Sequence, residues 1–154
     1  MFLQDRKAFT MLELIFVIVI IGILSAIAIP KFKGASDMAY DAKGQNALSI
    51  VLSALATERQ KRILTGSFTP ITDLGDATNA FNKFDGAGRE IMDIPVTNCS
   101  SGQTGCWKRV DATHYEYFFS DSTTAASGGK AKFKLANSKL VCDNDATDCN
   151  KLLQ

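Results

Sequence analysis

A continuous apolar segment near the amino terminus, FTMLELIFVIVIIGILSAIAI at residues 9–29, is the feature that most constrains the fold. A helix of this length rises about 31 Å at about 1.5 Å per residue, which matches the roughly 30 Å hydrocarbon core of a bilayer. Glu13 is its single formal charge. Arg6 and Lys7 precede the segment, and Pro30 follows it. The segment therefore predicts a membrane-spanning helix.

The carboxylate of Glu13 is costly inside this apolar segment. On insertion scales, an acidic side chain at the bilayer centre costs about 2.5–3.5 kcal/mol. Two interpretations are open: the side chain reaches the headgroup region from the helix end, or it pairs with a cation within the membrane. If the chain is cut between Ala8 and Phe9, the new amino group lies about one turn from Glu13. In an assembly, each of these groups can then meet the opposite charge of a neighbouring copy.

The string KAFTMLELIFVIVIIGILSAIAIP resembles the amino terminus of type IV pilins and of the pseudopilins of type II secretion systems. The matching features are a short basic leader, Phe9 at the first mature position with a Thr beside it, Glu13 at the fifth position, and the ending IIGILSAIAIP. The resemblance covers about residues 6–30. Ala8 stands before the cut, where the family usually has Gly.

This resemblance implies a maturation route and an assembly. A prepilin peptidase would cut after Ala8 and methylate the amine of Phe9, and Glu13 would pair with the amino terminus of a neighbouring subunit. The chain would lie in the inner membrane first, and then in a helical filament in the periplasm or at the cell surface. An inner-membrane assembly platform with an ATPase motor would drive that step. Type IV pilin and pseudopilin remain open as alternatives.

A second helical stretch is predicted beyond Pro30, over about residues 36–64. Apolar residues recur there at the three-and-four spacing of one helix face: Leu48, Val51, Leu52, Leu55 and Ile63. Because Pro30 removes one helix hydrogen bond, we expect a kink near it. The resemblance implies that helical order between Gly22 and Pro30 is lost on assembly, and a continuous kinked helix is the alternative.

Two segments in the second half of the chain alternate in the manner of β-strands. They are HYEYFF at 114–119 and KAKFKLA at 130–136, and SKLVC follows the second closely enough for a hairpin. Residues 66–113 are rich in Gly, Asp, Asn and Thr, which predicts a connecting loop. The expected fold class is α+β and pilin-like: a long amino-terminal helix, kinked near Pro30, packed on a small antiparallel sheet.

These segments divide the chain into a leader and three structural parts. The expected boundaries are 1–8 for the prepilin leader, 9–30 for the transmembrane and filament-core helix, 31–65 for the amphipathic second half of the helix, and 66–154 for a disulfide-stapled β domain.

The cysteines form two pairs of identical spacing, Cys99 with Cys106 and Cys142 with Cys149. An even number beyond the membrane segment suits disulfides in an oxidising compartment. Local pairing within each pair is our preference among the three connectivities that four cysteines allow. A zinc site is disfavoured, because zinc sites typically separate close cysteines by about two to four residues.

The sequence offers little for catalysis. His114 is the single histidine and lies in a strand pattern among aromatic residues, where a structural role is favoured. DGAGRE at 85–90 lacks the spacing of a phosphate-binding loop. We therefore expect a structural protein without a cofactor rather than an enzyme.

A calcium site is a weaker hypothesis for the loop DNDATD at 143–148. Asp143, Asp145 and Asp148 bring oxygen ligands close together, and the major pseudopilins that this chain resembles bind calcium in this part of the domain. The glycine and the glutamate of the EF-hand pattern are absent. A solvated acidic loop is the favoured interpretation.

DNA binding is a second weak hypothesis, as in a minor pilin of a DNA-uptake system. It rests on a row of lysines along the predicted hairpin: Lys130, Lys132, Lys134 and Lys139. Alternating lysines also protect an exposed strand from aggregation. The formal net charge of +1 disfavours DNA binding.

An ordinary secretory signal is the competing interpretation of residues 1–29. The triplet AIA ending at Ala28 resembles a signal peptidase site, and cleavage there would release a soluble periplasmic binding domain beginning at Ile29. Against this interpretation, the apolar run exceeds the usual 7 to 15 residues and contains Glu13. We therefore favour the filament subunit.

Overall fold

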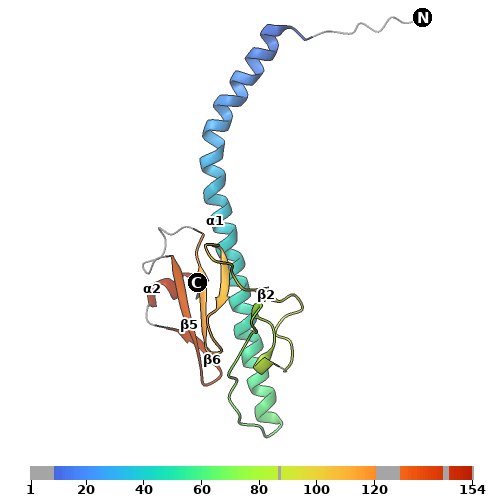
Figure 1. Cartoon of the computed structure of the whole chain (residues 1–154), viewed down its shortest axis with the longest axis vertical. Coiled ribbons are helices and arrows are strands. Elements are labelled where there is room, and N and C mark those ends of the chain that lie inside the picture. The colour runs from blue at the N-terminus through green and yellow to red at the C-terminus, as the bar shows by residue number, and fades with distance from the viewer. Residues whose placement is uncertain (1–8, 87, 121–128, 144–145, 154) are drawn as a thin grey trace, which may run out of the picture. The chain divides into compact units, whose positions relative to one another are not determined.

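The computed structural model describes residues 9–153 except 87, 121–128 and 144–145 (Figure 1). The chain divides into two compact units, Met1–Ser36 and Asp37–Gln154. Helix α1, Met11–Leu64, contributes to both. Each unit is therefore described by itself.

Helix α1 does not stop at Pro30. We expected the second stretch to begin near residue 36, whereas residues 31–35 are also helical. Proline fixes φ near −65°, a value that a helix accepts, so the helix loses one hydrogen-bond donor without having to end. Helix α1 is thus continuous across Pro30 in the unassembled chain. The kink near Pro30 and the loss of order from Gly22 onward remain predictions.

The second unit contains a four-stranded antiparallel sheet in the order β3-β4-β5-β6. The strands are β3 Cys106–Arg109, β4 His114–Phe118, β5 Lys130–Ala136 and β6 Lys139–Cys142. Both predicted strands and the hairpin are confirmed. Asn137 and Ser138 form the hairpin turn with φ values of 51° and 59°, the left-handed conformation of a type I′ turn.

Residues 66–113 contain more structure than the predicted connecting loop. They include β1 Asn79–Phe81, the short 3₁₀ helix η1 Phe84–Gly86, β2 Val96–Thr97 and β3. Strands β1 and β2 pair as a small antiparallel sheet. Asp76 holds the start of β1, since its Oδ1 accepts hydrogen bonds from the backbone N–H groups of Thr78 and Asn79 at 2.8 and 2.7 Å. The Asp and Asn residues that suggested a loop thus support short strands through side-chain hydrogen bonds.

The core lies between α1 and the inner face of the sheet (Figure 1). The buried apolar positions of α1 are Ala47, Leu48, Val51 and Leu55, as the helical spacing predicted for three of them. Buried side chains alternate along β4 and β5. Ile63 is an exception to the prediction, because half of its side chain is exposed near the end of the helix.

A short helix, α2 Ala146–Leu153, was not predicted and covers part of one strand edge. Strand β6 pairs with Phe133–Ala136 only, so the first part of β5 lies beyond its reach. There the carbonyl oxygen of Lys132 accepts hydrogen bonds from the backbone N–H of Asp143 at 2.9 Å and from the Cys149 thiol at 3.0 Å. Leu152 is buried in the core. Helix α2 therefore protects a backbone edge that would otherwise be open to pairing.

Two aromatic side chains of the sheet donate hydrogen bonds to backbone carbonyl groups of α1. The Tyr117 hydroxyl donates to the Tyr40 carbonyl oxygen at 2.8 Å, and the Trp107 indole N–H donates to that of Gly44 at 3.2 Å. A side chain at Gly44 would overlap the ring of Tyr117. We call these two hydrogen bonds and the contact at Gly44 the aromatic clamp.

Gly44→Ala is expected to lower the thermal stability of the second unit. Alanine favours a helix by about 1 kcal/mol over glycine, but overpacking costs about 1–3 kcal/mol, and the Tyr117 ring occupies the space for the new methyl group. The measurement is thermal unfolding of the purified chain in detergent, followed by the near-ultraviolet circular dichroism of Trp107. Gly34→Ala is the matched control, because among the described residues nothing lies within 4 Å of its added Cβ. Equal unfolding temperatures for Gly44→Ala and the unmodified chain would contradict the clamp.

Candidate assembly site

Thr10 caps the amino-terminal end of α1. Its Oγ1 accepts a hydrogen bond from the backbone N–H of Glu13 at 3.2 Å, and its carbonyl oxygen accepts one from Leu14 at 3.2 Å. The helix therefore begins at Met11, and Phe9 and Thr10 precede it. This cap was not among our predictions, although the sequence carries the T-x-x-E spacing of a capping box.

Glu13 lies in the first turn of α1, where the helix dipole favours a negative side chain. It shares a groove along the helix surface with the following side chains: Thr10, Leu12, Ile15, Phe16 and Val19. The Thr10 cap fixes the backbone of Glu13 through the hydrogen bond to its N–H. The site thus presents one carboxylate in an otherwise apolar stretch of helix surface, where a cation would find a strong partner.

The first unit exposes its apolar side chains. The most apolar 18-residue window of α1 has a mean hydropathy of 2.9 and is 0% buried. By length and composition, this helix is able to cross a membrane. Soluble monomers rarely expose so large a contiguous apolar surface, so lipid or other apolar helices are the natural cover. Among the described residues, nothing lies within 4 Å of a Cβ added at Gly22, and a small residue there leaves room for a neighbouring helix to approach.

The expected cleavage junction is described on one side only. Phe9 is 75% exposed and precedes the helix, whereas Ala8 lies outside the described residues. Cleavage after Ala8, methylation of Phe9 and the pairing of Glu13 therefore remain predictions.

The predicted Cys99–Cys106 disulfide is present. It closes a loop that leads into β3, and the backbone N–H of Cys99 donates to the carbonyl oxygen of Trp107 at 2.8 Å. Gly105 in this loop packs so closely on the Tyr40 ring of α1 that an added Cβ would collide with it. The disulfide loop is therefore fixed against the helix beside the aromatic clamp.

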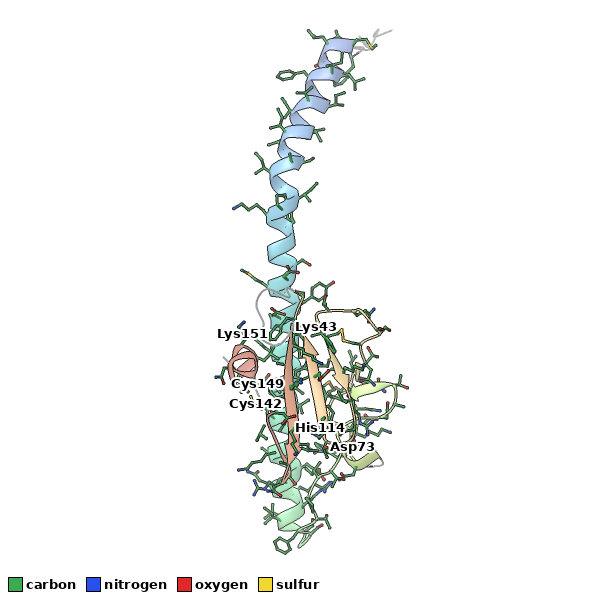
Figure 2. The ribbon with its side chains drawn as sticks, turned by 60° about the vertical axis from the view of Figure 1, so that its left-hand side comes forward. Lys43, Asp73, His114, Cys142, Cys149 and Lys151 are labelled. Atoms are coloured by element: carbon green, nitrogen blue, oxygen red, sulfur yellow. A yellow bond between two sulfur atoms is a disulfide. The ribbon has the colours of Figure 1, made fainter. Side chains whose placement is uncertain are left out.

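The predicted Cys142–Cys149 disulfide is wrong for this structure, in which both cysteines are free. Figure 2 labels both: Cys142 is the last residue of β6, and Cys149 lies within α2. Burial, together with the neighbouring Cys142, raises the pKa of the Cys149 thiol to about 12. The Cys149 thiol donates a hydrogen bond to the Lys132 carbonyl oxygen at 3.0 Å.

The calcium hypothesis is not tested. Asp143 is described, but Asp145 and the side chain of Asp148 lie outside the described residues. In the part of the chain that the structure describes, no group of three His, Cys, Asp or Glu side chains could hold a metal ion.

The row of lysines on the hairpin is interleaved with acidic groups. Lys130 Nζ lies 2.9 Å from Glu116 Oε1, and the strand register places Glu116 opposite Lys132. His114, at the other end of β4, lies 2.8 Å from an oxygen of Asp111. This face of the sheet carries charges of both signs, so it lacks the uniform basic surface typical of a DNA-binding site.

A network centred on Asp73 joins the segment before β1 to the sheet. Arg109 contacts both carboxylate oxygens of Asp73, at 2.9 and 2.6 Å, and the Tyr115 hydroxyl accepts a hydrogen bond from the backbone N–H of Leu74 at 2.8 Å. Burial by itself favours the protonated form of Asp73, but the hydrogen bonds from Arg109 and from the backbone of Gly75 outweigh it and lower the pKa of the carboxyl. Asp73 and His114 are labelled in Figure 2.

Asp85 forms a similar anchor for η1. Its Oδ1 accepts a hydrogen bond from the backbone N–H of Thr72 at 2.7 Å, and its Oδ2 lies 2.6 Å from Arg62 Nη2 on α1. Burial favours protonation here too, yet these hydrogen bonds and the charge of Arg62 lower the pKa of Asp85.

Comparison with known proteins finds one matching family, at the amino-terminal end of the chain. Residues 3–29 match the family described as the prokaryotic N-terminal methylation motif. The chain is 48% identical over 61 residues to the type IV narrow pilus major component PilA5 of Thermus thermophilus, a match that covers 38% of this chain and 53% of that protein. The chain thus spans about half the length of the curated relative that it matches. No solved structure matches it significantly.

Acid is expected to destabilise the second unit through Asp73 and Asp85. Both carboxyls have a pKa below the usual 3.8 in the folded chain, so their contribution is fully present above about pH 4 and is lost as the pH falls through their folded-state values. The measurement is the unfolding temperature of the purified chain at a series of pH values from about 7 to 2.

Asp73→Asn serves as the control for this prediction. The variant should be less stable at neutral pH, because it loses the ionic contact with Arg109, and its stability should fall less steeply below about pH 4. Curves that stay parallel for the variant and the unmodified chain would show that Asp73 does not carry the acid sensitivity.

Proposed function

We propose that this chain, a protein of the type IV pilin family by its amino-terminal methylation motif and its pilin-like α+β fold, is a structural subunit of a type IV pilus-like filament. The observation that supports this function most directly is the exposed apolar helix with the single carboxylate of Glu13 in its first turn. The role is structural, and the chain is not an enzyme.

Filament assembly would replace lipid around the first unit by the helices of other copies. Because lipid chains are as apolar as these side chains, the hydrophobic effect contributes little to this exchange. Helix packing and the pairing of charges must then favour assembly. The Glu13 carboxylate and the amine of Phe9 from a second copy would each neutralise the other in a medium where an unpaired charge is costly.

The disulfide and the helix support the compartments that we propose. The Cys99–Cys106 disulfide suits an oxidising compartment, so the second unit would lie on the periplasmic side of the inner membrane before assembly and in a periplasmic or surface filament afterwards. The partners would be other copies of the chain, a prepilin peptidase, and an assembly platform with an ATPase motor. The similarity to PilA5, the major component of a narrow type IV pilus, favours a major pilin over a pseudopilin.

The mature amino terminus tests this function. Intact-mass and peptide mass spectrometry of the chain from native membranes or filaments should find a start at Phe9 with one added methyl group. A start at Ile29 would identify a secreted soluble protein, and a start at Met1 would identify an unprocessed membrane protein. Either of these two results would contradict the proposal.

Glu13→Gln is expected to abolish filaments while leaving the chain in the membrane. The variant leaves the partner's amine without a counter-charge, at a cost of about 2.5–3.5 kcal/mol per subunit, which lowers the equilibrium constant for subunit addition on the order of a hundredfold. The measurement is the amount of chain in sheared filaments relative to membranes. Glu90→Gln is the control, since Glu90 is a well-exposed carboxylate whose ion pair is 4.0 Å long and worth little. Normal filament yield from Glu13→Gln would refute the role of Glu13.

A further inference from the structure

We propose that the end of helix α1 is an interaction surface for a second copy of this chain, and that the Phe68 side chain of one copy inserts into a cavity beside Trp107 of another. This inference rests on the proposed function, because it concerns contacts between subunits of the filament. It goes further by assigning a subunit contact to the second unit, in addition to the apolar helix and the charge of Glu13.

Three apolar side chains at the end of α1 are left exposed by the fold, and we call them the apolar tip. Ile63, Leu64 and Phe68 are 50%, 86% and 82% exposed. Ile63 and Phe68 line the same depression, so they lie together. Large apolar side chains gathered on a surface among polar neighbours are typical of a contact with another molecule.

Hydrogen bonds hold the turn that carries Phe68. Before it, the backbone N–H of Ser67 donates to the Arg62 carbonyl oxygen at 2.8 Å. After it, the Thr69 carbonyl oxygen accepts a hydrogen bond from the Arg62 guanidinium at 3.3 Å. Both neighbours of Phe68 are thus tied to the helix. The exposed ring therefore loses little backbone freedom when an interface buries it, which favours binding.

A cavity of about 230 Å³ lies beside the aromatic clamp, and we call it the clamp cavity. Its mostly apolar walls include Gly44, Ala47, Ile94, Val96, Trp107 and Tyr117. An apolar cavity of about 150 Å³ is able to hold a benzene ring, so the clamp cavity has room for a phenylalanine ring. The two aromatic walls would also give that ring favourable aromatic neighbours.

The Phe68 side chain cannot reach the clamp cavity of its own chain. The helix between Ala47, which lines the cavity, and Leu64, at the helix end, is about 26 Å long. The four residues after Leu64 span at most about 14 Å. Lys43, a further residue of the cavity wall, lies far above the end of α1 in Figure 2. A knob and a cavity on different parts of one chain make a head-to-tail contact, which builds helical filaments when it does not close into a ring.

The charges beside the two surfaces are complementary. Arg59 lines the depression at the apolar tip and has no ion pair within the part of the chain that the structure describes. At the clamp cavity, Asp93 directly precedes Ile94, and Asp41 accepts a hydrogen bond from the clamp tyrosine at 3.4 Å. These two carboxylates outnumber the one lysine of the cavity wall, Lys43. A basic tip therefore meets a cavity with a net negative border, which favours this pairing over contact between two tips.

The test is photo-cross-linking in filaments of the full-length chain. The variant Phe68→p-azidophenylalanine keeps the phenyl ring and adds a small photoreactive group. Sheared filaments are irradiated, cross-linked dimers are isolated under denaturing conditions, and peptide mass spectrometry locates the new bond. We expect dimers in which position 68 of one copy is joined to residues 94–97 or to Trp107 of another. Bonds to other parts of the second copy, or filaments without dimers, would overturn the contact.

The variant Phe68→Ala measures how much the contact contributes to the filament. Burial of a phenyl ring changes an equilibrium by at least about tenfold, so sheared filaments of this variant should disassemble in mild detergent at least about tenfold faster. Phe68→Leu keeps an apolar side chain and should have a smaller effect. Val110→Ala is the matched control, since Val110 is 53% exposed and lines neither the depression at the tip nor the clamp cavity.

The near-ultraviolet circular dichroism of Trp107 separates this contact from a role within one chain. The unfolding temperature of the purified Phe68→Ala chain in detergent should equal that of the unmodified chain, because Phe68 is exposed. A lower unfolding temperature, or equal filament stability for Phe68→Ala and Val110→Ala, overturns the contact and leaves the proposed function intact. Absence of filaments from the unmodified chain overturns both.

Discussion

The constraint on which the structure depends is that a long apolar helix needs cover along its length. In the second unit, the sheet provides it, since aromatic and aliphatic side chains bury Leu48, Val51 and Leu55 of α1. In the first unit, the apolar window is 0% buried by the described chain. The part of α1 in the second unit is therefore covered by the sheet. The apolar part in the first unit is left for contact with lipid or with neighbouring helices.

Polar contacts accompany the apolar packing where the sheet meets the helix. Tyr117 and Trp107 donate hydrogen bonds to carbonyl groups of α1, and Gly44 allows the Tyr117 ring to come close. The Cys99–Cys106 disulfide fixes the neighbouring loop. These contacts would suit the filament subunit that we propose, because they hold the sheet on the helix independently of what covers the apolar part of α1.

The sequence predicted those parts of the fold that follow from local patterns. Alternation identified 114–119 and 130–136 as strands, and the helical spacing identified the buried face of α1. Strands β1 and β2 were missed because they are short, and because β1 begins where backbone N–H groups donate to the Asp76 carboxylate, which no periodicity reveals. The Cys142–Cys149 spacing misled us, since it cannot show that a short helix directs the Cys149 thiol at a backbone carbonyl. At the candidate assembly site, Glu13 was recognisable in the sequence because it is a charged residue among apolar ones. The Thr10 cap is indicated only by the four-residue T-x-x-E spacing in the same apolar stretch.

The most direct test of the central claim is an electron cryomicroscopy map of filaments formed by this chain. We expect the apolar helices of many copies at the centre, with each Glu13 carboxylate within about 4 Å of the amino group of Phe9 on a neighbouring copy, the range of an ion pair. A map in which Glu13 faces solvent, or in which the apolar helices do not contact one another, would contradict the claim that other copies cover this helix.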